Sequence, residues 1–215
     1  MGQVFVIGLA GGIGSGKSTV AEALGRLGAE TLDADAMVHE LLGTPPVVAR
    51  VVRRFGRGVL DAEGRIDRRA LAAVAFRTRR SIRDLERLLH PAVIAATKKR
   101  IAALRRAKGR HVVVIDAPLL FEAKMDRMCD EVVFVDAPKR ARLARLAKTR
   151  GWTRATLDAR EKHQKGIDYK RRNADIVIRN DASRRETLTQ IRRYWDHVQA
   201  CHGGALARSR AILNA

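Results

Sequence analysis

The stretch GLAGGIGSGKST, residues 8–19, places five glycines among twelve residues directly behind the apolar run Val4–Ile7. An apolar run of this length suits a short buried strand. From Ser18 onward, apolar residues recur at helical spacing as far as Gly28, and glycine commonly ends helices. The glycine-rich stretch therefore joins a strand to a helix.

The same stretch matches the phosphate-binding pattern G-x-x-x-x-G-K-[ST], with its fixed positions at Gly11, Gly16, Lys17 and Ser18. Without Cβ atoms the backbone can curl so that successive N–H groups converge on phosphate oxygens, and the helix directs its positive end at the same anion. Lys17 can then reach the β and γ phosphates while the Ser18 hydroxyl holds Mg²⁺. A plain glycine turn is the alternative, against which the Lys-Ser pair and both flanks argue. The residues expected to bind ATP here are Gly11, Gly12, Ile13, Gly14, Ser15, Gly16, Lys17, Ser18 and Thr19.

Strand-like runs alternate with helical patterns along the rest of the chain. The later strands are expected at residues 30–32, 111–115, 131–135 and 176–178. Such alternation predicts an α/β fold with a parallel five-stranded sheet flanked by helices.

Helical patterns dominate three further segments. Residues 44–107 form a mostly helical insertion, broken by the glycine-rich loop 56–64 and by Leu89-His90-Pro91. Two basic helices are expected between Pro138 and Lys165, with a turn at residues 150–152. A last helix is expected from about residue 183 to 199, followed by a frayed tail at 200–215.

The composition constrains the class of partner. With 43 Lys and Arg against 23 Asp and Glu, the chain of 215 residues carries a formal charge of +20, which favours polyanionic partners such as nucleotides. We expect most of these cations to coat the solvent faces of helices. Aromatic residues make up only 4% of the chain and do not interleave with the basic runs, so a nucleic-acid-binding protein is the weaker alternative.

Other classes of site and location find little support in the sequence. Cys129 and Cys201 stand far apart without CxxC spacing, so neither a zinc site nor a disulfide framework is expected. No apolar run has the length of a membrane span, and the first residues lack the basic start of a secretion signal. We expect a soluble, cytoplasmic protein that does not bind membranes.

Carboxylates at the ends of the expected strands suggest how a phosphate acceptor is held. A kinase needs a base that takes the proton of the acceptor hydroxyl, and the carboxyl ends of parallel strands line the ligand crevice. Asp33 and Asp35 follow the strand at 30–32; the alternative is that one of them caps the next helix, a role we expect of Asp33. Asp116 follows the strand at 111–115 and fits either a Walker-B acid or a turn residue before Pro118.

The order of these motifs closely resembles the dephospho-CoA kinase family, from about residue 4 to 198. The resemblance rests on residues 8–19, Asp33-Ala-Asp35, Gly64–Arg68, Leu89-His-Pro91, Asp116–Glu122, Arg160–Gln164 and Lys170–Asn180. It implies a P-loop NTPase fold and transfer of the ATP γ-phosphate to the ribose 3′-hydroxyl of dephospho-CoA, the last step of coenzyme A synthesis. ATP and Mg²⁺ are the implied cofactors. The alternative within enzymes is another P-loop nucleotide or metabolite kinase.

The resemblance also implies how the chain is divided. The expected parts are a nucleotide-binding core at 1–35, 108–138 and 166–199, a helical acceptor domain at 36–107, a lid at 139–165 and a tail at 200–215.

The resemblance further assigns roles to single residues. Asp35 becomes the base facing the 3′-hydroxyl, and Lys17 becomes catalytic together with Arg160. Arg145 also neutralises phosphate charge, although arginines in such basic helices are usually solvated surface residues. Asn180, just past the last strand, is expected near the adenine.

The acceptor is expected to contact a further set of residues, comprising Asp33, Asp35, His90, Asp116, Leu119 and Phe121. His90 has an alternative role as a cap of the preceding helix. Leu119 and Phe121 either wall the acceptor pocket or pack in the core.

Overall fold

A computed structural model describes residues 2–203 of the chain. It divides into two compact units, one formed by the described residues of Met1–Leu32 and Ile101–Ala215 and the other by Asp33–Arg100. None of the described helices combines the length and apolar character that a bilayer-spanning segment needs.

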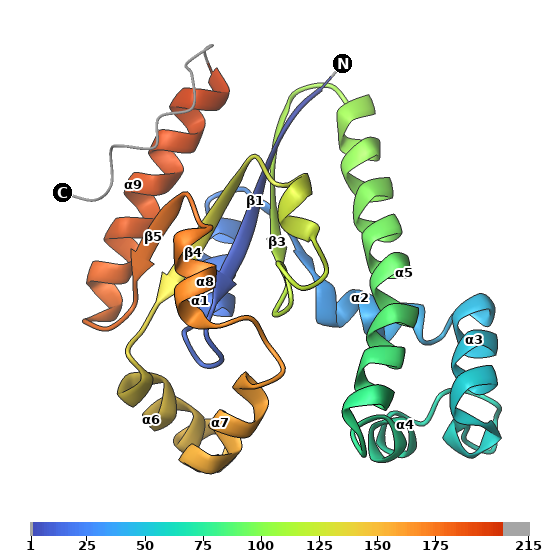
Figure 1. Ribbon diagram of the computed structural model, residues 1–215. Helices are drawn as coiled ribbons and strands as arrows, with labels where there is room; N and C mark the ends of the chain where they lie inside the picture. Colours follow the sequence, from blue (N-terminus) through green and yellow to red (C-terminus); the bar gives the residue numbers. More distant parts are fainter. Residues whose placement is uncertain (1, 204–215) are drawn as a thin grey trace. The chain divides into compact units, whose positions relative to one another are not determined.

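The first unit is built on a five-stranded sheet with the order β2-β3-β1-β4-β5 (Figure 1). β1 pairs in parallel with both β3 and β4, and β4 pairs in parallel with β5. The strands are β1 (Gln3–Gly11), β2 (Glu30–Asp33), β3 (Arg110–Asp116), β4 (Glu131–Asp136) and β5 (Ile176–Arg179). The predicted parallel five-stranded α/β sheet is confirmed.

The helices of the first unit are α1 (Lys17–Arg26), the end of α5 (Arg79–Arg106), α6 (Lys139–Arg150), α7 (Arg154–Glu161), α8 (Ile167–Arg172) and α9 (Arg184–Gly203), with the short 3₁₀ helix η2 (Met125–Met128). Of these, α1 and α9 pack against the sheet. The two helices expected between residues 138 and 165 are confirmed as α6 and α7, but only α6 is basic, since α7 has two acids for its two arginines. Gly151 ends α6 in the left-handed conformation that glycine tolerates.

The main core lies between the sheet and the pair α1 and α9. Ile7 and Leu9 of β1 pack there with Leu24 of α1 and Tyr194 of α9, all of them without measurable exposure. The other side of β1 is just as tightly covered, because a Cβ at Gly8 would lie only 2.7 Å from Cys129 Sγ and 3.0 Å from Leu120 Cδ2. β1 is thus buried on both faces, as a central parallel strand requires.

The second unit is helical and has a core of its own. It contains α2 (Ala34–Leu41), α3 (Pro45–Phe55), the 3₁₀ helix η1 (Arg57–Val59), α4 (Arg68–Ala75) and most of α5. The buried residues of this core are Leu42, Val47, Val51, Val59, Leu71, Ala75 and Leu89. The predicted loop at 56–64 is closed by an antiparallel bridge between Leu60 and Ile66.

Three of the boundaries predicted from the sequence are wrong. β1 runs on to Gly11 rather than ending at Ile7, because residues 8–11 pair with residues 132–135 of β4. No helix ends at Leu89-His90-Pro91, because α5 continues through Pro91. Leu89 and Val93 on either side of the proline are both buried, so tertiary packing carries the helix across the missing N–H group. At the other end of the chain, α9 extends to Gly203 rather than ending near residue 199, and the rest of the expected tail lies outside the described residues.

Candidate active site

The predicted phosphate loop links the end of β1 to the start of α1. Gly16 stands at the N-cap of α1 with φ 94°, a left-handed conformation that residues with a side chain seldom adopt. Gly14 has φ 77°, and a Cβ there would meet Leu146 of α6 at 2.9 Å. The glycines therefore permit both the turn and the close packing of α6 beneath it, and the loop opens toward the positive end of α1.

The carbonyl groups of the loop are held from outside by side chains. Arg145 Nη1 donates to the Ser15 carbonyl at 3.1 Å, and Asn180 Nδ2 donates to the same oxygen at 2.7 Å. Arg145 Nη2 also donates to the Asn180 carbonyl at 2.5 Å. Arg145 and Asn180, both expected at the nucleotide site, thus meet at the Ser15 carbonyl. We call the side of the loop on which these side chains bind its carbonyl groups the outer side.

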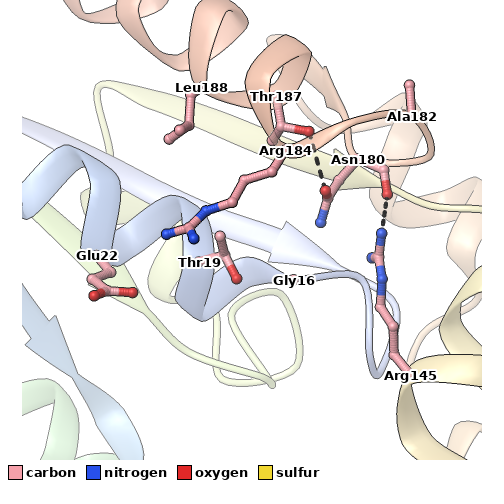
Figure 2. A pocket seen from close by; sticks show the side chains of 9 residues that line it. All are labelled: Gly16, Thr19, Glu22, Arg145, Asn180, Ala182, Arg184, Thr187 and Leu188. Atoms are coloured by element: carbon pink, nitrogen blue, oxygen red, sulfur yellow. Dashed lines mark hydrogen bonds between the residues drawn. The ribbon is translucent and has the colours of Figure 1, made fainter.

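A pocket of about 330 Å³ opens beside the start of α1 (Figure 2). It is lined by Gly16, Thr19, Glu22, Arg145, Asn180, Ala182, Arg184, Thr187 and Leu188. The Asn180 side chain is fixed in this wall, because its Oδ1 accepts a hydrogen bond from Thr187 Oγ1 at 3.2 Å while its Nδ2 is bound to Ser15. The pocket adjoins the phosphate loop through Gly16. If the phosphates of a nucleotide bind the loop, this pocket is the space beside it for the base.

Asp116 lies within reach of the phosphate loop. It is the last residue of β3, and the Ser18 hydroxyl donates to its Oδ2 at 3.4 Å. Within the described part of the chain, no group of three or more His, Cys, Asp or Glu side chains is arranged to hold a metal ion. A hydroxyl and a carboxylate beside a phosphate loop nevertheless fit Mg²⁺, which prefers oxygen ligands and takes only one or two from the protein when substrate phosphates supply others.

Arg160 lies at the end of α7 and is exposed. Its guanidinium stacks over the Trp152 ring at 4.5 Å from the centroid, and that of Arg150 lies 5.3 Å from the same centroid. α6 and α7 are also joined by an ion pair of 2.6 Å between Lys139 Nζ and Asp158 Oδ1. The segment that carries Arg160 is therefore a folded helical hairpin.

A buried lysine for which no role was predicted joins the base of this hairpin to the loop after β3. Lys170 is 2% exposed, and its Nζ donates to Gln164 Oε1 at 2.9 Å and lies 3.6 Å from Glu122 Oε1. Burial lowers the pKa of Lys170, and the nearby Glu122 carboxylate opposes that shift. Glu122 also accepts a hydrogen bond from the Lys165 backbone N–H at 2.7 Å, which anchors the chain where the hairpin returns to the core.

The two apolar residues expected at the acceptor site differ in burial. Leu119 is half-buried, whereas Phe121 is 4% exposed and packs edge-on against the Tyr169 ring at a centroid distance of 5.7 Å. Phe121 therefore packs in the interior of the first unit.

The remaining predicted residues, Asp33, Asp35 and His90, belong to the second unit. Asp33 caps α2, since its Oδ1 accepts from the N–H groups of Asp35 at 2.8 Å and Ala36 at 3.1 Å. The capping role expected of Asp33 is confirmed. The alternative role of His90 as a helix cap is wrong, because α5 does not end there.

Arg142 of α6 and Lys170 are both almost fully buried, with 1% and 2% exposure, and neither was expected in the interior. Nothing in the sequence separates Arg142 from its many exposed basic neighbours. For Lys170, the Glu122 carboxylate in the stretch Asp116–Glu122 was a clue, since a buried acid needs a cation close by. The pocket residues Arg184 and Thr187 carry no motif at all and follow only from the fold.

The chain is similar over most of its length to known proteins of one family. The family model for dephospho-CoA kinase matches residues 5–209. A dephospho-CoA kinase of Symbiobacterium thermophilum is 40% identical over 200 residues, covering 93% of this chain and 83% of that relative. A dephospho-CoA kinase of Corynebacterium diphtheriae is 40% identical over 191 residues, covering 88% of this chain and 95% of the relative.

A solved structure from Thermus thermophilus, TT1252, superposes with a TM-score of 0.75 at 32% identity, covering 92% of this chain and 97% of that one. The match of the family model extends from the first strand past the last described helix, and the two relatives cover nearly the whole chain. The phosphate loop, the acid at the end of β3 and the helical hairpin all lie within the matched residues. The chain belongs to the dephospho-CoA kinase family.

Proposed function

We propose that this protein transfers the γ-phosphate of ATP to the ribose 3′-hydroxyl of dephospho-CoA, giving coenzyme A and ADP. The observation that carries the proposal is the phosphate loop between β1 and α1, with Ser18 and Asp116 joined beside it, in a chain of this family. The loop is suited to binding a polyphosphate, and membership of the dephospho-CoA kinase family indicates that the acceptor is dephospho-CoA. Location in the cytoplasm stays a prediction.

ATP is held first by its phosphates. N–H groups of the loop between Gly11 and Thr19 bind the phosphate oxygens, except that of Ser15, which donates to the Gly12 carbonyl at 3.0 Å. Lys17 neutralises the β and γ phosphates. The adenine occupies the pocket between Gly16 and Asn180. Arg145 forms the wall of this pocket and fixes the loop by its hydrogen bond to Ser15, so it acts on the nucleotide through the position of the loop as well as through its charge.

Asp35 accepts the proton of the 3′-hydroxyl as the oxygen attacks phosphorus, and the bond between the γ-phosphorus and the bridging oxygen of ADP breaks. Because Asp33 is occupied as the cap of α2, the neighbouring carboxylate of Asp35 is the better candidate for the base. His90 and Leu119 are proposed to contact the acceptor, with Asp33 and Phe121 supporting the elements around it.

Ser18 and Asp116 would hold Mg²⁺. When bound, this ion supplies positive charge that offsets the charge of the phosphates. Arg160 contributes a further cation from the hairpin of α6 and α7, which we propose acts as a lid that keeps water from the γ-phosphate.

A panel of acceptors incubated with the purified protein, Mg²⁺ and γ-labelled ATP tests the proposal. We expect label in dephospho-CoA and little in AMP, gluconate or shikimate, with slow ATP hydrolysis when no acceptor is present. Efficient labelling of one of the other acceptors while dephospho-CoA remains untouched would replace the proposal with a different P-loop kinase.

A further inference from the structure

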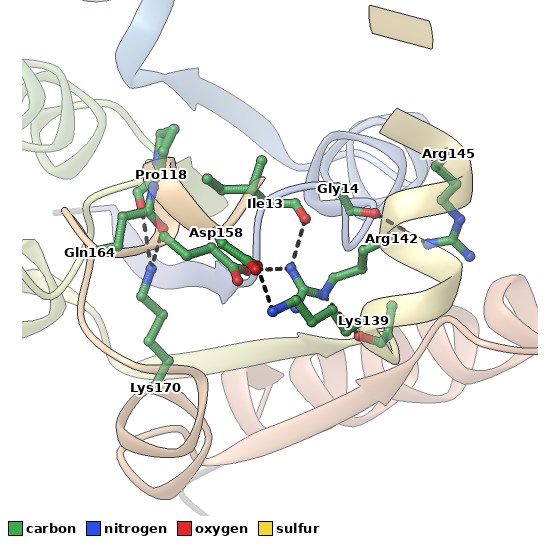
Figure 3. A network of polar contacts seen from close by, with 11 residues as sticks. Ile13, Gly14, Pro118, Lys139, Arg142, Arg145, Asp158, Gln164 and Lys170 are labelled. Atoms are coloured by element: carbon green, nitrogen blue, oxygen red, sulfur yellow. Dashed lines mark hydrogen bonds and ion pairs between the residues drawn. The ribbon is translucent and has the colours of Figure 1, made fainter. Parts of the chain in front are cut away.

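Arg142 of α6 is the most deeply buried cation in the described part of the chain, with 1% of its surface exposed. Its Nε donates to the Ala137 carbonyl at 3.1 Å, and its Nη1 donates to the Ile13 carbonyl at 3.0 Å and pairs with Glu161 Oε1 at 2.5 Å. A guanidinium loses its hydration on burial, so a position of this kind is tolerable only when protein groups replace the water. Three separate segments supply those groups to Arg142. Figure 3 shows the contact with Ile13.

The contact with Ile13 reaches the phosphate loop from its outer side. Gly12 lies so close that a Cβ added there would be 2.8 Å from Arg142 Nη1 and 3.0 Å from its Cζ. Gly12 is one of the unspecified positions of the phosphate-binding motif, so the motif itself does not explain a glycine here. The close approach of the Arg142 guanidinium does.

This contact determines the direction of one peptide group in the loop. In a trans peptide the C=O of one residue and the N–H of the next point in opposite directions. Since Arg142 binds the Ile13 carbonyl on the outer side, the N–H of Gly14 points to the inner side, where a phosphate oxygen would be bound. Arg145 acts in the same way two residues later by binding the Ser15 carbonyl.

The contact with Glu161 links Arg142 to the end of α7, next to Arg160, which is one of the cations of the proposed mechanism. Glu161 is the last residue of α7 and follows Arg160 directly. One guanidinium therefore binds both a carbonyl of the phosphate loop and the end of the helix that carries Arg160.

We propose that Arg142 is a positioning residue for phosphate transfer: it orients the phosphate loop through Ile13 and sets the place of Arg160 through Glu161. The inference rests on the proposed function, because it concerns how that site is held. Arg142 touches no reacting atom, so its removal changes the geometry of the groups that do.

The test uses Arg142→Met, Arg142→Lys and Glu161→Gln, with Tyr194→Phe as a matched control. Tyr194 has no measurable exposure, and its hydroxyl donates to Glu131 Oε2 at 2.9 Å, a buried polar contact of the same unit that involves no loop residue. For each folded variant, we would measure the melting temperature, kcat, KM for both substrates and the dissociation constant of ATP.

We expect Arg142→Met to weaken ATP binding about 10- to 100-fold, the size of one hydrogen bond to a charged group, because the Gly14 N–H is no longer held toward the phosphate; kcat should fall as well. Arg142→Lys should recover part of both losses, since one ammonium can bind either partner but cannot span them with the same geometry. Glu161→Gln should lower kcat with little change in ATP affinity, because the contact with Ile13 remains. Tyr194→Phe should lower only the melting temperature.

A merely structural role for Arg142 would give a different pattern, in which Arg142→Lys and Glu161→Gln change the melting temperature as Tyr194→Phe does and leave kcat and ATP affinity at their normal values. That result would overturn the inference even if Arg142→Met does not fold. Failure of the proposed function is distinguishable from it, because the wild-type protein would then not phosphorylate dephospho-CoA, while the effect of Arg142 on ATP binding could still be measured.

Discussion

Asp33 and Asp35 are separated by one residue but stand in different chemical situations. The Asp33 carboxylate is bound to two backbone N–H groups at the start of α2, which is the arrangement of a helix cap. Asp35 lies within the first turn of α2 and accepts neither of those bonds. The difference agrees with the proposal that Asp35, and not the helix cap Asp33, is the proton acceptor.

Asp35→Asn should lower kcat by about two to four powers of ten, because an amide cannot take the proton of the acceptor hydroxyl. The ATP dissociation constant should stay close to that of the wild type. Steady-state kinetics together with equilibrium ATP binding would check both expectations. Asp84→Asn is a suitable control, since Asp84 is an acid of the same unit that pairs with Arg54; an unchanged kcat for Asp35→Asn would remove Asp35 from the mechanism.

The sequence predicts residues well where a motif fixes their chemistry, and poorly where only burial distinguishes them. Gly16, Lys17 and Ser18 could be placed at the start of a helix because their spacing has a mechanical reason. Arg142 and Lys170 could not, because in a chain with 43 Lys and Arg the expectation for each is a solvated surface. Whether a guanidinium finds carbonyl and carboxylate partners in the interior depends on the tertiary fold.

At the scale of the elements, strands were easier to predict than helix ends. The buried strands β3 and β4 are continuous apolar runs, which few other structures explain. The helix end predicted at Pro91 is wrong. Proline disfavours the interior of a helix, but the burial of α5 residues on both sides of Pro91 outweighs that local preference.

One of the charge pairs between α6 and α7 joins Lys139 to Asp158. The hydrogen bond from Lys139 holds the pKa of Asp158 below its ordinary value of 3.8. A carboxyl with a lowered pKa in the folded protein stabilises that fold above its unfolded pKa, and the contribution is lost as the pH falls through the folded pKa. Both side chains are more than a third exposed, so the contribution is small and weakened by salt.

Titration of Asp158 by NMR should therefore give a pKa below 3.8, and Lys139→Met should bring it back toward that value. Arg154 Nε lies 3.8 Å from the same carboxylate, so part of the shift should persist in the variant. Identical titration curves for the two proteins would show that the Lys139 contact does not exist in solution.

At the scale of the whole molecule, each unit has an interior that excludes solvent. Cys129 is half-buried and reports on the first interior, because burial raises the pKa of its thiol to about 12, and the nearby Asp126 adds to the effect. At pH 8 about one such thiol in ten thousand is ionised, and only the thiolate reacts with alkylating agents.

Cys129 should accordingly resist iodoacetamide in the native protein and react once the protein is unfolded in denaturant. Mass spectrometry of tryptic peptides after timed labelling would measure both rates. Labelling of native Cys129 as fast as in the unfolded chain would contradict the tight packing of Cys129 and Leu120 against Gly8 of β1.

The most direct measurement of function is the position of the phosphate in the product that the protein makes from dephospho-CoA and ATP. Proton and phosphorus NMR of the purified product should show a new phosphate coupled to the 3′-carbon proton of the ribose, with one ADP formed for each molecule of product. A phosphate on the 2′-hydroxyl, or release of inorganic phosphate with dephospho-CoA unchanged, would contradict the proposed transfer to the 3′-hydroxyl.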